Sequence, residues 1–578
     1  MRRLLTFASA AAVVAGTAAI TGSAASTPAS PQTQVRSQVD DLIRQLLETT
    51  PRGIATPMAR TAIEEAAFGV DPSDPRSIAG GHRRAPHGLV GSDPIQAQAV
   101  TADAAAPAGP GLPNVRVNNP AEDSHIVDQS TQSETSIAVA GSNVVVGFND
   151  SQNGLLSFTG ADTNLTGVAA SHDGGKTFTD GGVVPNAGGY LNFGDPWLAS
   201  DASGTFYYST LMLDYRGPFD IVIGVSRSTD GGRTWTDPVN ASLALETSAK
   251  YQVEIGDKPA LVSAPSGLYV AWDDFTIGTV NGYNALFNGV AVAHSTDGGK
   301  TWKASYASNK PLLNGAVGAC GKYIIGAQPM VAADGSVSVA AEQFSFCGRN
   351  GKLHNNIMVF SSGDQGATWS QSASLDIVSS TAGQGTFLLG AGQYMRNDEF
   401  PTVAVHNGVE YMAWNDGGDG SGHSHIRLAL SANGGHSWST SFITSGTNDE
   451  AQPSITADST GVHILYYEAS GVRPGCTFAF GCGGEDADGQ LDVMVANSPD
   501  GFTWTQRRVS TQSFPGVYTL PNFDPFIAWT YMGDYTGIAT DGTHQYMAWG
   551  DNRDMVTNWV WPQGRHDPNV YFARQDTP

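Results

Sequence analysis

Ser228-Thr-Asp230-Gly-Gly232-Arg-Thr234-Trp235 is one of six copies of a short motif that determines the fold we expect. The other copies begin at Ser171, Ser295, Ser362, Ser431 and, in shortened form, Ser498. Their Asp or Asn positions are 57, 67, 67, 69 and 67 residues apart. A repeat of this length, with turn chemistry at its centre, is typical of a repeat architecture rather than of unrelated domains.

Each residue type in the motif has a structural use. The Asp side chain can accept hydrogen bonds from the backbone amides of its own turn. The glycines permit the positive φ that a tight hairpin requires. The terminal Trp or Phe offers a large apolar surface for burial beneath the turn. We therefore interpret all six copies as structural and exclude them from the candidate active site.

The pattern S-x-D-x-G-x-T-W resembles the Asp-box, or bacterial neuraminidase repeat, of the sialidase-like β-propellers. We expect an all-β propeller, with seven blades favoured and six as the alternative. Seven segments share an apolar alternation, a small turn and a second strand, and they begin near Glu134, Asp195, Asp257, Gln328, Glu399, Gln452 and Asp534. The last repeat has no Asp-box after residues 569–573, so we expect residues 114–118 to supply its outer strand and close the ring.

Composition limits the classes of partner. The chain has 578 residues, with 30 basic and 54 acidic side chains and a net charge of -24. This balance argues against nucleic acid or an anionic membrane surface as the partner. The 69 glycines suit an all-β protein with many turns.

The N-terminus predicts export from a bacterial cell. Arg2 and Arg3 precede an apolar stretch, so residues 1–25 read as a signal peptide. Residues 26–112 read as a short helical and low-complexity stalk or pro-segment with a linker, and residues 113–578 as the propeller. In the oxidising setting outside the cell we expect two disulfides, which pair Cys320 with Cys347 and Cys476 with Cys482. No later segment is apolar and long enough to span a bilayer.

In a propeller blade, the start of the first strand and the end of the second strand lie on one face. The acids at those positions are Glu134, Asp150, Asp195, Asp257, Asp273, Asp274, Glu342, Glu399, Asp416, Glu468, Asp534 and Asp551. The nearby cations are Lys258, Arg396 and Arg553, and the aromatic neighbours are Tyr394, Tyr531 and Tyr535. Carboxylates that share a pocket raise one another's pKa values, and two carboxyls with separated pKa values can hydrolyse a glycosidic bond.

From this rim we select the candidate catalytic residues. Asp534, Tyr535, Asp551 and Arg553 come first, because a single blade would present all four. Glu399, Arg396, Glu134 and Asp150 complete the set. In the sialidases that the chain resembles, a Tyr nucleophile is activated by a Glu, and an Asp is the acid/base. The alternative for Tyr535 is simple packing in the inner strand.

One feature departs from that family. Sialidases open their first blade with Phe/Tyr-Arg-Ile-Pro, whose Arg helps to bind the carboxylate of sialic acid. Here Glu134 stands where that Arg would be, and the sequence contains no Arg-Ile-Pro. An acidic rim also repels a carboxylated sugar. The resemblance therefore implies the fold and not a specificity for sialic acid.

A cation site is a separate hypothesis. Asp486, Asp488 and Asp492 place oxygen ligands around Gly489, as calcium loops do. The alternative is an ordinary solvated acidic turn. We expect no cofactor to be required, with a structural calcium ion as the one candidate.

Two functions remain open at this stage. The first is a secreted glycoside hydrolase that acts on an extracellular glycan or glycoprotein through carboxylates at the rim. The second is a non-catalytic propeller that binds glycans or proteins. The sequence leaves the sugar and the oligomeric state open.

Overall fold

The structure is a computed structural model of the chain. It describes residues 111–121, 123, 131–150, 164–214, 220–245, 251–280, 283–309, 321–346, 354–378, 387–390, 393–395, 399–470, 490–518, 533–557, 562 and 564–578. The expected signal peptide, most of the expected stalk, the four cysteines, Arg396, Asp486 and Asp488 lie outside these residues. All regular secondary structure within them is β-strand, which confirms the all-β expectation.

Five antiparallel sheets have four strands each. The first contains β2 (Gln132–Ala140), β3 (Asn143–Asp150), β4 (Thr166–Ser171) and β5 (Thr179–Val183). The next contains β15 (Gly321–Val331), β16 (Val337–Phe346), β17 (His354–Ser362) and β18 (Ser370–Ile377). Two more contain β21 (Thr402–His406), β22 (Val409–Asp416), β23 (His425–Ser431) and β24 (Ser439–Phe442), and then β25 (Asp449–Asp458), β26 (Gly461–Ser470), β27 (Gln490–Ser498) and β28 (Thr505–Arg508). The last contains β30 (Gly537–Thr540), β31 (His544–Val556), β32 (Arg565–Asp576) and β1 (Asn114–Arg116).

A nine-stranded sheet combines two arrays. One array holds β6 (Tyr190–Asn192), β7 (Trp197–Ser200), β8 (Phe206–Asp214), β9 (Asp220–Ser228) and β10 (Val239–Asn240). The other holds β11 (Tyr251–Ala264), β12 (Gly267–Val280), β13 (Tyr283–Ser295) and β14 (Lys303–Tyr306). A parallel pairing of Ile255 with Ile221 joins them. A small separate sheet contains β19 (Phe387–Gly390), β20 (Gln393–Met395) and β29 (Val517–Tyr518).

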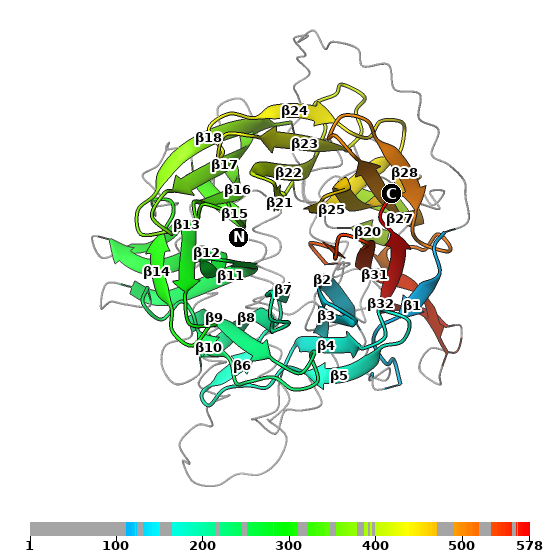
Figure 1. Cartoon of the computed structure of the whole chain (residues 1–578), viewed down its shortest axis with the longest axis horizontal. Helices are drawn as coiled ribbons and strands as arrows, with labels where there is room; N and C mark the ends of the chain where they lie inside the picture. The colour runs from blue at the N-terminus through cyan, green and yellow to red at the C-terminus, as the bar shows by residue number, and fades with distance from the viewer. Residues whose placement is uncertain are drawn as a thin grey trace.

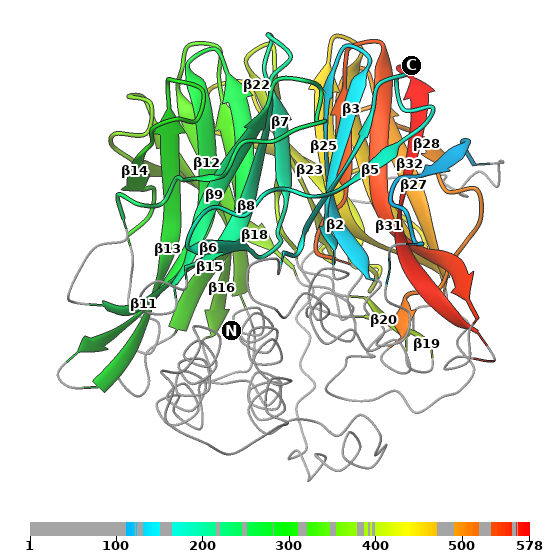
Figure 2. The same cartoon turned by 90° about the horizontal axis from the view of Figure 1, so that it is seen from below.

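The sheets stand around a common axis (Figure 1). Their innermost strands contact one another in the cyclic order β2, β7, β11, β15, β21, β25, β30 and again β2. The strands run roughly along the axis, and β19 and β20 lie beyond the same end at which β11 and β12 project (Figure 2). This radial arrangement of antiparallel sheets is a β-propeller.

The ring closes as the sequence predicts. The N-terminal strand β1 pairs with β32 from the C-terminal end of the chain, with Val115 opposite Phe572. Leu112, just before β1, is buried and donates its backbone N–H to the carbonyl of Val509. Segments from the two ends of the chain are thus tied into one sheet, and this outer edge is covered.

Every copy of the motif forms the expected turn, and the six turns join β4 to β5, β9 to β10, β13 to β14, β17 to β18, β23 to β24 and β27 to β28. In the second copy, Ser228 Oγ donates to Asp230 Oδ1, and Thr234 donates to the same carboxylate through its N–H and its hydroxyl. Ser228 Oγ also accepts from the N–H of Gly232. We call the six turns that begin at Ser171, Ser228, Ser295, Ser362, Ser431 and Ser498 the Asp-box turns.

The hydrophobic core lies between neighbouring sheets. One apolar cluster joins β22 and β23 to β25–β27, and another joins β25–β27 to β31 and β32. Large aromatic residues recur at one level of the second strands and are fully buried at Phe148, Trp272, Trp414, Tyr466 and Trp549. Burial of one such side chain contributes about 1.5–3 kcal/mol, so the core stiffens the frame that carries the central residues.

No helix in the described part of the chain is long and apolar enough to cross a membrane.

Candidate functional site

One position recurs at the start of each innermost strand, two residues before regular pairing with the second strand begins. In the first sheet, Ser133 pairs with Asn149 and Ser136 with Gly147, so Glu134 occupies an irregularity between them. Equivalent irregularities contain Lys258, Gly326 and Gln452. We define the central ring as the residues at this position: Glu134, Asp195, Lys258, Gly326, Phe400, Gln452 and Tyr535.

The backbone is strained at four of the seven central-ring positions. Glu134, Asp195, Lys258 and Gln452 have φ values of 52°, 52°, 51° and 50°. This left-handed region is unfavourable for residues with a Cβ atom. Such strain concentrates at functional sites, where the surrounding structure holds it in place. The recurrence of this conformation in the central ring therefore makes the ring the first place to look for function.

Charged side chains from separate sheets meet at the axis. Lys258 Nζ lies 2.6 Å from Asp534 Oδ2, 3.3 Å from Glu134 Oε1 and 3.7 Å from Asp195 Oδ2. The Lys258 side chain is only 6% exposed, and each of the three carboxylates is 2% exposed or less. We call these four residues the Lys258 cluster. Because an unpaired buried charge costs several kcal/mol, the ammonium and the carboxylates depend on one another.

Aromatic rings flank the ammonium group. Lys258 Nζ lies 5.3 Å from the ring centre of Tyr535 and 5.6 Å from that of Phe400. The Tyr535 hydroxyl donates to the backbone carbonyl of Pro196 at 3.1 Å, and its ring packs against Trp197. In this geometry Tyr535 stabilises the cation through its ring.

Asn149 fixes two of the carboxylates. Its side-chain amide donates to Glu134 Oε2 at 2.9 Å, and its carbonyl oxygen accepts from the backbone N–H of Asp195 at 2.8 Å. Gly533, with a φ of 92°, allows a close approach, because a Cβ atom there would lie 2.6 Å from the backbone nitrogen of Glu134. Gln452 donates to the carbonyl of Gly533 at 2.6 Å. These contacts position the segment that carries Asp534.

The carboxylates of the cluster are not equivalent. Burial raises the pKa of Asp195 well above its ordinary value, and the neighbouring Glu134 carboxylate raises this pKa further, although Lys258 opposes the shift. A hydrogen bond with Glu134 also raises the pKa of Asp195. One neutral and one ionised carboxyl side by side are the components of acid/base chemistry.

A second acidic pair adjoins the cluster. Asp257 and Asp273 face each other across β11 and β12, and both side chains are buried. Asp273 accepts the backbone N–H groups of Gly326 and Ala327 at 2.6 and 3.0 Å. Burial and the charge of Asp257 nevertheless raise the pKa of Asp273 well above its usual range.

The structure brings together some of the residues selected from the sequence. Glu134, Asp534 and Tyr535 meet around Lys258. Glu399 is buried and immediately precedes Phe400, whose ring flanks the same ammonium group.

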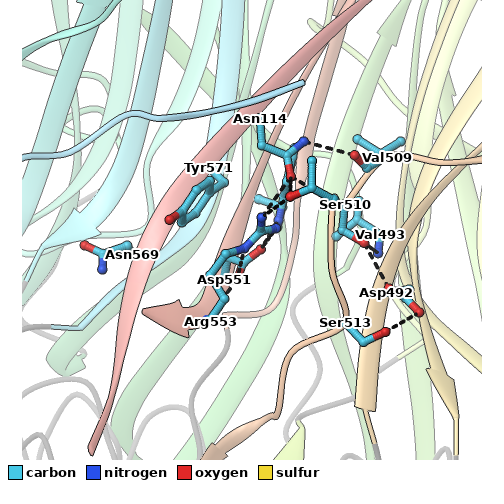
Figure 3. Close-up of polar contacts among 12 residues, drawn as sticks. Asn114, Asp492, Val493, Val509, Ser510, Ser513, Asp551, Arg553, Asn569 and Tyr571 are labelled. Carbon is cyan, nitrogen blue, oxygen red and sulfur yellow. Dashed lines mark hydrogen bonds and ion pairs between the residues drawn. The ribbon is translucent and has the colours of Figure 1, made fainter. Parts of the chain in front are cut away.

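Asp551 and Arg553 engage a different region. Arg553 donates through Nε to Asp551 Oδ1 at 2.9 Å, through Nη1 to Asn114 in β1 at 3.0 Å, and to Thr511 at 2.7 Å, and its guanidinium lies over the ring of Tyr571 (Figure 3). The pair thus links the closing strand to the β27–β28 side of the neighbouring sheet. The sequence predicts that one blade presents Asp534, Tyr535, Asp551 and Arg553 together. Asp534 and Tyr535 contact Lys258, whereas Asp551 forms an ion pair with Arg553 beside β1.

Asp150 belongs to another acidic group. Its carboxylate accepts a hydrogen bond from Gln132, which also donates to Asp123. Burial, with the charges of Asp150 and Asp567, raises the pKa of Asp123 to about 9. Asp150 therefore acts on the charge state of Asp123 in this part of the rim.

Of the three aspartates in the calcium hypothesis, only Asp492 lies within the described residues. Asp492 accepts hydrogen bonds from Ser510 and Ser513 and forms an ion pair with Arg508, as Figure 3 shows for Ser513. Its charge is thus neutralised by side chains of the protein. Within the described ranges, no group of three or more His, Cys, Asp or Glu residues is arranged to hold a metal ion.

The sequence-based choice missed the centre of the site. Lys258 and Asp195 were recognised as rim residues but were not selected. A usable signal was present, since both residues precede the start of regular alternation by two positions, as Glu134 does. Aligning the repeats on that position identifies the members of the central ring but not which of them meet.

No family model matches the sequence, and no curated protein matches it either. Solved structures with a similar arrangement include a Hadza microbial sialidase, with 17% identity over 61% of this chain and 66% of that chain and a TM-score of 0.38. The NanB sialidase of Streptococcus pneumoniae has 12% identity over 75% of this chain and 83% of its own, with a TM-score of 0.37. An α-L-arabinofuranosidase of Fusarium graminearum has 15% identity over 62% and 93%, with a TM-score of 0.36. Because these similarities are distant, we infer function from the side chains of this chain.

Proposed function

We propose that the chain is a secreted, seven-bladed propeller of the sialidase-like class that hydrolyses glycosidic bonds in extracellular glycans. The count of seven follows from treating the two arrays of the nine-stranded sheet as separate blades. Secretion is proposed from residues 1–25, which have the composition of a signal peptide. The partner that we propose for the protein is a glycan or glycoprotein outside the cell.

The observation that carries the proposal is the unequal set of carboxyls around Lys258. Asp195 is held in its neutral form by burial and by Glu134. Asp534 lies 2.6 Å from the Lys258 ammonium, which favours its ionised form. Glycoside hydrolysis needs such an acid and such a carboxylate on either side of the scissile bond.

The chemistry can then be assigned to named groups. The Asp195 carboxyl donates its proton to the glycosidic oxygen, so that the bond to the leaving sugar breaks. Asp195 Oδ2 and Asp534 Oδ2 both lie within 3.7 Å of Lys258 Nζ, which leaves less than the roughly 6.5–9.5 Å that a water between the two carboxyls needs. The Asp534 carboxylate therefore attacks the anomeric carbon as the nucleophile, and water then hydrolyses the glycosyl-enzyme bond with Asp195 as the base. Lys258 holds Asp534 ionised until that step, and Asn149 keeps Glu134 and the backbone of Asp195 in place. The Glu134 carboxylate helps to keep the pKa of Asp195 raised.

The test is sugar release by the full chain from neutral, amino, uronic and sialylated glycans. Asp195→Asn and Asp534→Asn are expected to lower the rate about 10²–10⁴-fold, the usual contribution of a positioned catalytic group. Asp334→Asn is the matched control, because Asp334 is exposed in the turn between β15 and β16. Unchanged release in both cluster variants would contradict the proposal.

A non-catalytic binding propeller is the second candidate. It is favoured by the low exposure of the cluster, in which every carboxylate lies within 3.7 Å of Lys258. Glycan or protein binding by the full chain, with no sugar released from any substrate, would support this alternative.

A further inference from the structure

Asp257 has a carboxylate with no assigned partner. It immediately precedes Lys258 on β11, and only 1% of the residue is exposed. Neither carboxylate oxygen of Asp257 accepts a hydrogen bond within the described structure. A buried carboxylate left in this state costs several kcal/mol. The position therefore calls for a donor that the protein itself does not supply among these residues.

Among the described residues, carboxylates outnumber cations around Asp257. Asp257 acts electrostatically on both Asp195 and Asp273, so it faces the Lys258 cluster as well as the opposite strand. Lys258, the next residue along the chain, is already within ion-pair distance of three other carboxylates. Three described arginines are paired with other carboxylates: Arg553 with Asp551, Arg427 with Asp416 and Arg508 with Asp492.

Excess negative charge selects the ligand. A sugar carboxylate at this position would add a further anion to a buried acidic group, which is unfavourable at low dielectric. A protonated amine would donate hydrogen bonds and supply the missing positive charge. A metal ion would also supply charge, but the described residues contain no group of three or more ligands with suitable geometry.

We propose that Asp257 forms a subsite for the ammonium group of an amino sugar, and that the glycan recognised by the central ring carries such sugars. The inference rests on the proposed function for the choice of a sugar as the ligand. Asp257 accepts hydrogen bonds from the ammonium, and Lys258 keeps its contacts with the other three carboxylates.

The experiment measures binding and not turnover. Glucosamine, N-acetylglucosamine and glucuronic acid are titrated into the full chain at about pH 6, where an amine with the ordinary α-amino pKa of about 8 is protonated. Saturation-transfer NMR or calorimetry gives the dissociation constants. We expect glucosamine to bind about tenfold or more tightly than the other two, since a charged hydrogen bond contributes about 1.5–3 kcal/mol.

Variants locate the subsite. Asp257→Asn is expected to weaken glucosamine binding about tenfold to a hundredfold and to leave N-acetylglucosamine nearly unchanged. Asp334→Asn makes the same change of charge at an exposed turn and is expected to bind like the unmodified protein. If Asp257→Asn does not fold, the preference of the unmodified protein for the amine over the N-acetyl sugar decides the question.

The outcomes separate the two proposals. Equal binding of all three sugars, a preference for glucuronic acid, or an unchanged affinity in a folded Asp257→Asn would overturn the subsite. Displacement of glucosamine by methylammonium at equal concentration would also overturn it, because the site would then bind any cation. Glucosamine binding without sugar release from any glycan contradicts the hydrolase and leaves the subsite intact. Release of a uronic sugar without glucosamine binding supports the hydrolase and overturns the subsite.

Discussion

The Asp-box turns and the central ring lie at opposite ends of the same sheets, and their chemistry differs. Each Asp-box turn repeats the same bonds, with a Ser hydroxyl, an Asp or Asn side chain and a Thr or Ser in the same roles. The central ring instead has a different residue type at each of its seven positions, although Glu134 and Asp195 are both acids.

This difference separates structural repetition from function. A turn that closes a hairpin solves the same local problem in every sheet, so one solution recurs. The central ring has no such local need, and its side chains meet their partners across the axis, as Lys258 does with Glu134. A position equivalent in backbone geometry but varied in chemistry is therefore the stronger indication of a site.

The largest expected effect is at Lys258. Lys258→Met leaves the ionised carboxylates of the Lys258 cluster without their cation and is expected to lower the free energy of unfolding by about 3–5 kcal/mol at neutral pH. Lys300→Met replaces the same residue type in an exposed Asp-box turn and is expected to change the free energy of unfolding by about 0.5 kcal/mol or less. Urea denaturation of both variants measures the difference.

If Lys258→Met and Lys300→Met lowered the free energy of unfolding equally, the difference that we infer between the central ring and the Asp-box turns would be wrong. The loss at Lys258 should also shrink as the pH falls, because protonated carboxylates no longer need the ammonium. A loss that grows toward acid pH would contradict the ion-pair account.

A smaller and uniform effect is expected in the Asp-box turns. Ser228 Oγ donates to Asp230 at 2.8 Å and accepts from Gly232 at 2.9 Å, and Ser295 makes the same two bonds in its own turn. Ser228→Ala and Ser295→Ala each leave a buried N–H unsatisfied and are expected to lose about 1–3 kcal/mol. Urea denaturation should give two values that agree within about 0.5 kcal/mol.

The double variant provides the control. Because the two turns lie on different strands, the losses in free energy of unfolding from Ser228→Ala and Ser295→Ala should add in the double variant. Losses that differ widely between the turns would mean that the motif is not a repeated local device.

The sequence predicted the frame better than the site. The Asp-box turns, the alternating strands and the closure by β1 follow from local rules, so they could be predicted from residue type and spacing. The acidic rim was also predicted as a set, and Glu134, Asp534 and Tyr535 were correctly grouped at one end of the sheets.

Which rim residues meet could not be predicted, for a physical reason. The left-handed backbone of the central ring is adopted by Glu134, Asp195, Lys258 and Gln452, and no glycine marks these positions in the sequence. Asp551 and Asp534 come from the same repeat, but Asp551 pairs with Arg553 beside β1. Only the packing of separate sheets determines such partners.

The smallest expected effect concerns acid stability, and here the two regions should respond with opposite signs. Hydrogen bonds from the hydroxyl and N–H of Thr368 lower the pKa of Asp364 to about 2 in its Asp-box turn. Its stabilisation is present above the unfolded pKa of about 3.9 and is lost as the pH falls through that range toward about 2. Asp195 has a raised pKa, so its contribution is full below about pH 3.9 and is lost as the pH rises through the raised value.

Asparagine substitutions test both signs in one experiment, the melting temperature measured from about pH 2 to pH 9. Asp364→Asn should flatten the acid side of the curve by about 2 °C or less, since the carboxylate is solvent-exposed. Asn is compatible with the turn, because Asn433 accepts the equivalent N–H of Ser437 in another copy. Asp195→Asn should flatten the curve above about pH 4 instead. If both variants changed the same side of the curve, the opposite electrostatic environments inferred for the Asp-box turns and the central ring would be wrong.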